Sequence, residues 1–482
     1  MSALLSPKAV LERCHLRDAR FRPGHKLSVY LDLIVRLGVT KGYRVRPITV
    51  TWESNIDRDR GEETGNLAQL QAEAVRLGVA TPFLQLMADT PERGMHIRVS
   101  PLDARFIQLV RLSDPRHVRT MLGDACASAN AGSAQRRISD CRVISVRYRP
   151  GKRHVLRYEP VDPLKGDVVF AKLYTSESGA QAFRVANRAA DWLEQRAEGV
   201  NAARPLAYVA EDGVVLYPRV VGTPLSHLMR CPREGLAGFL ERTGAALRTL
   251  HRLPGTVVGP LEVRNFAYEI QAIERASSHI PAMLPRLGAA IDTLLDRAKE
   301  LDERLPQESP TFTHRDFKSE HVWVTPSELT LIDFDRGRLA DPALDVGTFL
   351  ADLQWWHATH NLRGMVEAQE RFLVGYVPGV PIERVIRARL YEAIKLVKMA
   401  VVRVHVFEHN WASRTAGLVE RAKVVMADLQ RVLGLPVRVC PRARRLHRWP
   451  SGRAGKGRRR ELFPFASEAI IDRLEETTLP LD

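Results

Sequence analysis

Residues 311–335 read TFTHRDFKSEHVWVTPSELTLIDFD, and this stretch decides the predicted fold. Three short β-like runs (TFTH, HVWV and LTLIDF) alternate in it with polar loops. Asp316 follows the first run, and Asp333 ends the third run seventeen residues later. On both sides of the stretch, from about residue 225 to residue 434, the apolar residues recur with helical period, over residues 234–252, 264–304, 343–360, 363–375 and 384–434. We therefore expect a small β insertion within a helical half of the chain.

Two carboxylates, each on a loop that leaves a strand, suit phosphoryl transfer from a nucleotide. One carboxylate can orient and deprotonate an attacking hydroxyl group, while the other holds the Mg²⁺ that bridges the phosphates. The alternative is that both aspartates only form turns. Their pairing at this spacing, after a β-rich half that contains a strand lysine, favours the chemical interpretation.

The half of the chain before residue 225 is rich in strand patterns. Residues 27–36, 43–52, 143–158 and 168–174 read as strands or hairpins. Residues 20–24 (RFRPG) match residues 147–151 (RYRPG) 127 positions later, so the hairpin is either duplicated or similar by coincidence. Lys172 lies in the later strand of the second copy, and the first copy has no lysine there. A β-rich half, a short connector and a helical half predict two lobes with a cleft between them.

Composition excludes several classes of protein. Of the 482 residues, 45% are hydrophobic and 27% are charged, which argues against bulk disorder. The sequence contains no run approaching the roughly 20 apolar residues that span a bilayer. The N-terminus lacks the basic and apolar regions of a secretory signal, so we expect a cytoplasmic protein.

The net charge of +16 is concentrated near the C-terminus. Residues 438–460 contain ten Arg and Lys residues and no acidic residue. Such a segment can bind a polyanion, or it can be a solvated connector; the scarcity of aromatic residues favours the connector.

These motifs resemble the aminoglycoside phosphotransferase family of small-molecule kinases, which includes maltokinases and choline and homoserine kinases. The resemblance covers about residues 140–435 and includes residues 247–251 (LRTLH) and 341–345 (DPALD). It implies an α+β, two-lobed, protein-kinase-like fold with a β-rich N-lobe and a mostly helical C-lobe. An N-terminal α/β extension precedes the lobes and is most similar to the cap of the maltokinase-like branch. The expected domains are an extension or cap at 1–125, an N-lobe at 140–225, a C-lobe at 226–437 and a basic tail at 438–482.

The resemblance also implies roles for individual residues. Asp316 would be the catalytic base and Asp333 the Mg²⁺ ligand, while Lys172 would contact the α- and β-phosphates of ATP. The backbone of Tyr217–Val220 would face the adenine, which makes Tyr217 and Val220 candidate nucleotide-binding residues. Arg149, Gly151 and Lys152 would occupy the turn that covers the phosphates, where basic side chains and exposed amides attract phosphate.

One departure from the family pattern concerns a metal ligand. His321 stands where the family has an asparagine that serves as a second metal ligand, so we take His321 as a candidate ligand. An imidazole suits Mn²⁺ better than Mg²⁺. The resemblance further implies that Asp345 supports the catalytic loop rather than contacting the substrate.

The expected function is transfer of the γ-phosphate of ATP to a hydroxyl group of a small molecule, such as a sugar, an amino alcohol or an aminoglycoside. A protein substrate is disfavoured, because seven residues between Asp333 and Asp341 leave no room for a segment that grips a peptide. The alternative from another class is a pseudokinase, a nucleotide-binding scaffold that acts through the basic tail.

Overall fold

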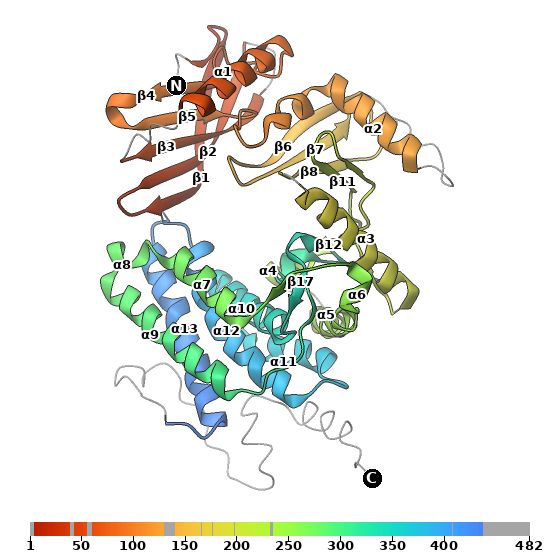
Figure 1. The fold of residues 1–482 in the computed structure, drawn as a ribbon, viewed down its shortest axis with the longest axis vertical. Coiled ribbons are helices and arrows are strands. Elements are labelled where there is room, and N and C mark those ends of the chain that lie inside the picture. Colours follow the sequence, from red (N-terminus) through yellow and green to blue (C-terminus); the bar gives the residue numbers. More distant parts are fainter. Residues whose placement is uncertain are drawn as a thin grey trace. The chain divides into compact units, whose positions relative to one another are not determined.

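The computed structural model describes residues 4–38, 43–54, 60–129, 140–164, 166–175, 177–196, 198–231, 235–406 and 408–436 (Figure 1). The predicted basic tail lies outside the described residues, so its contact with a polyanion stays a prediction. The chain forms two compact units. The N-terminal unit comprises Met1–Asn187, Ala203–Val220 and His405–His409, and the C-terminal unit comprises Arg188–Ala202, Val221–Val404 and Asn410–Asp482.

The N-terminal unit begins with a five-stranded antiparallel sheet in the order β1-β2-β3-β5-β4. Its strands are β1 (Ala9–Arg22), β2 (Lys26–Leu37), β3 (Tyr43–Glu53), β4 (Met87–Thr90) and β5 (Met95–Val99). Helix α1 (Arg60–Arg76) contributes Leu67, Leu70 and Ala74 to the same apolar core as Leu33 and Ile48 of the sheet. The extension is therefore an α/β element with an apolar core of its own.

A second five-stranded antiparallel sheet in the same unit has the order β10-β11-β8-β7-β6. Its strands are β6 (Cys141–Arg149), β7 (Arg153–Pro160), β8 (Val169–Leu173), β10 (Ala207–Val209) and β11 (Val214–Pro218). Helix α2 (Pro115–Ala129) adds Val118 and Met121 to the apolar core of this sheet. Helix α3 (Ser178–Arg196) follows β8 and continues into the C-terminal unit.

The two sheets repeat one topology. In each, three consecutive strands form a meander, a helix follows, and the fifth strand pairs with the third while the fourth lies at the edge. Lys172 pairs with Val155, and Thr51 pairs with Ser28, the residue 127 positions before Val155. The sequence repeat of the hairpin is therefore part of a repeat of the whole sheet, and Thr51 occupies the place of Lys172.

The C-terminal unit is mostly helical. Its helices are α4 (Leu225–Arg230), α5 (Leu236–His251), α6 (Gly255–Val258), α7 (Phe266–Ser277), α8 (Ile280–Met283), α9 (Pro285–Arg304), α10 (Ala343–His360), α11 (Met365–Tyr376), α12 (Ile382–Val402) and α13 (Trp411–Val432). Helix α10 is buried over most of its length and packs against α12. A Cβ on Gly347 of α10 would lie 2.5 Å from the carbonyl oxygen of Ala388, so the close approach of the two helices requires a glycine.

Two small sheets are inserted among these helices. One has the order β12-β15-β16-β9 and consists of β12 (Thr223–Pro224), β15 (Val322–Val324), β16 (Leu329–Leu331) and β9 (Val200–Ala202). The other has the order β13-β17-β14 and consists of β13 (Val263–Arg264), β17 (Arg338–Ala340) and β14 (Thr311–Thr313). The β insertion at residues 311–335 thus supplies strands to both sheets, and the loops between these strands carry the candidate site.

The predicted fold class is confirmed: the protein is α+β, with a β-rich N-terminal part that includes the α/β extension, and a helical C-terminal part. Two predicted helical stretches are wrong in detail. Residues 264–304 form three helices, because Pro281 and Pro285 cannot continue a helix. Residues 384–434 form two helices, because α12 ends at Val402 and α13 begins at Trp411. Within the described residues no helix is both long and apolar enough to cross a membrane. A cytoplasmic location stays a prediction.

Candidate active site

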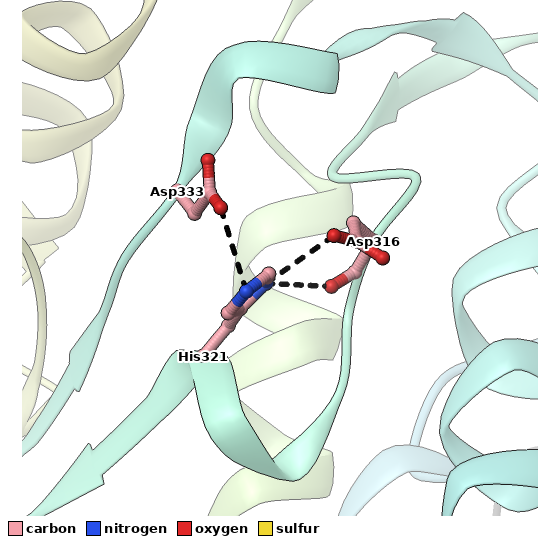
Figure 2. A group of neighbouring side chains, drawn as sticks. All are labelled: Asp316, His321 and Asp333. Atoms are coloured by element: carbon pink, nitrogen blue, oxygen red, sulfur yellow. Dashed lines mark hydrogen bonds and ion pairs between the residues drawn. The ribbon is translucent and has the colours of Figure 1, made fainter. Parts of the chain in front are cut away.

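Three of the predicted site residues lie together in the C-terminal unit: Asp316, His321 and Asp333 (Figure 2). Asp316 lies on the loop after β14, and His321 ends a short 3-10 helix, η5 (Ser319–His321), that leads into β15. Asp333 follows β16. Each residue offers one ligand atom, and these atoms all lie within 4.8 Å of one another.

The imidazole of His321 stands between the two carboxylates (Figure 2). Its Nδ1 lies 2.9 Å from the backbone carbonyl oxygen of Asp316, and its Nε2 lies 3.5 Å from Oδ2 of Asp333. A carbonyl oxygen can only accept, so Nδ1 carries the hydrogen. In the neutral ring Nε2 then offers a lone pair beside the carboxylate of Asp333. Two acceptors that face each other in this way suit a shared cation.

Burial and charge set the protonation of this group. Burial, and after it the charge of Lys318, lower the pKa of His321 to about 3, although the carboxylates of Asp333 and Asp316 act to raise it. Burial would raise the pKa of Asp316, but the positive charges of neighbouring groups, Lys318 and Arg336 among them, outweigh burial and hold this pKa below its usual range. Asp316 is therefore ionised and His321 is neutral under ordinary conditions.

The backbone around the site is unusual. In the described part of the chain, three residues other than glycine have a positive φ, and two of them are Arg315 (61°) and Asp333 (69°). A left-handed backbone costs an L-residue free energy and persists where surrounding contacts enforce it, often at functional sites. Both loops thus hold a strained residue at or beside a candidate catalytic carboxylate.

Asp345, at the start of α10, holds the loop that carries Asp316. It is fully buried, and its two carboxylate oxygens accept the amide hydrogens of His314 at 2.6 Å and Arg315 at 2.7 Å. The Nε2 atom of His251, on α5, lies 3.3 Å from the same carboxylate. The predicted supporting role of Asp345 is confirmed by these contacts.

Lys318 also belongs to the site, although no motif in the sequence singled it out. Its Nζ atom lies 3.3 Å from Oδ2 of Asp316 and 3.5 Å from Oε2 of Glu320. A lysine two residues after the candidate base was the available signal, since both side chains leave one short loop.

The remaining predicted residues lie in the N-terminal unit. Lys172 on β8 and Tyr217 on β11 belong to neighbouring strands, and the Lys172 ammonium lies 5.3 Å from the centre of the Tyr217 ring. Val220 follows β11 and is half-buried.

The turn between β6 and β7 carries Arg149, Gly151 and Lys152. The amide of Gly151, predicted to be exposed, donates to Oδ2 of Asp103 at 2.7 Å, and Arg149 pairs with Asp18 at 3.0 Å. The expectation of an exposed amide at Gly151 is thus wrong, because the extension supplies a carboxylate to it. Burial lowers the pKa of Lys152 and neighbouring arginines lower it further, which indicates a strongly positive hairpin tip.

Residues 164–379 match the sequence model of the phosphotransferase enzyme family. The family resemblance is confirmed. The matched segment includes Lys172, Asp316, His321 and Asp333, and it supports a phosphotransferase. It begins after the turn at residues 149–152, and the assignment to a maltokinase-like branch stays a prediction. No match among curated proteins reached significance.

Solved structures with a similar fold include three kinases. A choline/ethanolamine kinase family protein from Mesorhizobium loti is 16% identical, with 64% of this chain and 94% of that chain covered, at a TM-score of 0.39. A spectinomycin phosphotransferase in complex with ADP and spectinomycin is 13% identical, with coverages of 61% and 94% and a TM-score of 0.41. A choline kinase from Cryptosporidium parvum is 12% identical, with coverages of 64% and 96% and a TM-score of 0.44.

Proposed function

We propose that this protein transfers the γ-phosphoryl group of ATP to a hydroxyl group of a small molecule, of the kind found in sugars, amino alcohols or aminoglycosides. One observation carries the proposal: Asp316, His321 and Asp333 converge within 4.8 Å on loops of a segment that matches a phosphotransferase family. Two carboxylates and an imidazole in this arrangement can orient a nucleophile and hold a divalent cation.

Asp316 is the proposed base. Because it is ionised, its carboxylate can accept a hydrogen bond from the acceptor hydroxyl, orient the oxygen and take up the proton as the bond to phosphorus forms. Lys318, 3.3 Å away, keeps the carboxylate ionised until that step. Asp345 fixes the backbone of the loop and so fixes the direction of the carboxylate.

Asp333 and His321 are the proposed metal ligands. The neutral Nε2 of His321 and the Oδ2 of Asp333 present two lone pairs 3.5 Å apart, which fits a divalent cation. A Mg²⁺ or Mn²⁺ ion bound there would neutralise charge on the phosphates of ATP. A nitrogen ligand favours Mn²⁺ over Mg²⁺, because Mg²⁺ prefers oxygen.

The nucleotide roles of the N-terminal unit remain part of the proposal. Lys172 is the proposed contact to the α- and β-phosphates, and the backbone of Tyr217–Val220 is the proposed adenine contact. Arg149 and the amide of Gly151 already bind Asp18 and Asp103, so they would have to exchange these partners for a phosphate.

The experiment uses the full chain with ATP labelled in the γ-phosphate, Mg²⁺ or Mn²⁺, and a panel of sugars, amino alcohols and aminoglycosides. We expect label to move to at least one acceptor, in a reaction that requires Asp316 and Asp333. ATP binding without transfer to any acceptor or to water would instead support the pseudokinase alternative. Absence of both binding and transfer would refute the proposal.

A further inference from the structure

A buried cluster of charges lies beside the candidate base. Its centre is Glu269 on α7, whose side chain is 2% exposed. Three cations contact this one carboxylate: Arg315 of the catalytic loop, Lys395 at 2.7 Å and Lys398 at 3.5 Å. Lys395 and Lys398 lie three residues apart on α12 and so share one face of that helix.

The cluster holds more positive than negative charge. Arg315 and Lys395 are nearly buried with Glu269, and each makes a hydrogen bond to it. Lys398 is the third cation, and 24% of its side chain is exposed. The charge of Lys395, then burial, lowers the pKa of Lys398 to about 7. Crowded ammonium groups of this kind are stabilised when an anion binds to the accessible one.

The cluster is joined to the loop of the candidate base. Arg315, which precedes Asp316 in the chain, contacts the same carboxylate as Lys398. The charge of Asp316 opposes the lowering of the Lys398 pKa, and the charge of the exposed Arg336 lowers the pKa of both groups. Lys318 contacts Asp316 directly, at 3.3 Å. A molecule that offers its hydroxyl to Asp316 therefore places its other groups among cations.

We infer that the acceptor carries a negative charge, as a carboxylate or a phosphate ester on the same molecule as its hydroxyl group, and that Lys398 binds this charge. The inference rests on the proposed function and narrows its substrate class. An acceptor with an ammonium group would meet like charges at Lys398, Arg336 and Lys318, which disfavours amino alcohols and aminoglycosides.

Matched acceptors that differ in one charge test the inference. Gluconate, sorbitol and glucamine form a six-carbon set with an anionic, a neutral and a cationic end, and glycerate, glycerol and 3-amino-1,2-propanediol form a three-carbon set. Glycerol 3-phosphate separates a phosphate from a carboxylate. Calorimetry on the full chain measures binding of each compound without turnover, and label transfer from ATP measures the KM and kcat of each.

We expect an anionic member to bind at least about tenfold more tightly than its neutral and cationic counterparts, the usual scale of one charged hydrogen bond. Lys398→Met should remove this preference by raising the KM for the anionic acceptor about tenfold, with the KM for ATP unchanged. Lys398→Arg should restore most of it. Lys423→Met, which removes a lysine on α13 paired with Glu420, is the matched control and should change neither value.

The inference is overturned if the anionic members bind no better than the neutral members, or if Lys398→Met weakens all members of a set equally. These outcomes are distinct from failure of the proposed function. Transfer that depends on Asp316 but prefers a neutral or cationic acceptor leaves the function intact and refutes the inference. Binding of an anion that depends on Lys398, with no transfer of label, leaves the anion site intact and refutes the phosphotransfer.

Discussion

Asp345→Asn should weaken both the fold and the catalytic loop, because the change keeps the shape of the side chain and removes its charge. In the wild type, both carboxylate oxygens of the fully buried Asp345 accept a backbone N–H, from His314 and from Arg315. An asparagine presents one oxygen and one NH₂ group to these two donors. Whichever way the amide is oriented, one backbone N–H faces another donor.

The cost follows from these contacts. Loss of one charge-assisted hydrogen bond costs about 1.5–3 kcal/mol, and the unpaired buried donor costs about 1–3 kcal/mol more. We expect the free energy of unfolding to fall by about 4 kcal/mol, a large share of the roughly 5–15 kcal/mol typical of proteins. Thermal unfolding measures the loss, and label transfer from ATP should fall more than affinity for ATP, because the loop carries Asp316.

Asp296→Asn is the control for this prediction. Asp296 lies on α9, is 71% exposed and pairs with Lys299 at 3.2 Å, so its replacement should change stability by less than about 0.5 kcal/mol. An Asp345→Asn protein that unfolds at the same temperature as this control would show that the two amide contacts do not hold the loop.

Two further predictions concern the metal ligands. The pKa of His321 is about 3 in the folded protein and about 6.5 in the unfolded chain. Below pH 6.5 the unfolded chain therefore binds more protons than the folded protein. The free energy of unfolding should fall by about 2 kcal/mol by pH 5 for this reason. His321→Asn should lose less stability between pH 7.5 and pH 5 than the wild type, and its activity should shift from Mn²⁺ toward Mg²⁺; unchanged pH and metal profiles would exclude the histidine from the site. Asp333→Ala should abolish the divalent-dependent thermal stabilisation by ATP, worth about 2.7 kcal/mol at a hundredfold excess over the Kd, while Asp296→Ala should retain it. If ATP and metal stabilise Asp333→Ala as much as the wild type, a residue other than Asp333 is the metal ligand.

The local parts of the site could be predicted from the sequence. Asp316, His321 and Asp333 lie within eighteen residues, and the strands that carry them are too short and too closely connected to separate them. Lys318 could have been predicted for the same reason, because it stands two residues from Asp316 and contacts it directly.

Contacts between distant segments could not be predicted in this way. The ion pair of Glu269 with Lys395 joins α7 to α12 across 126 residues, and it depends on how the helices pack. The bond from the Gly151 amide to Asp103 likewise depends on a carboxylate from the extension, 48 residues away. The breaks in the predicted helix at 264–304 had a local signal, Pro281 and Pro285, that outweighs the helical pattern of apolar residues around them.

Asp316→Asn tests whether Asp316 is the base of a phosphoryl transfer. The measurement is the rate of label transfer from γ-labelled ATP to the preferred acceptor, made with saturating ATP and metal, beside a binding measurement for ATP. We expect a protein that folds and binds ATP as the wild type does but transfers label at least about 10²-fold more slowly. Transfer at a near wild-type rate in Asp316→Asn would contradict this expectation.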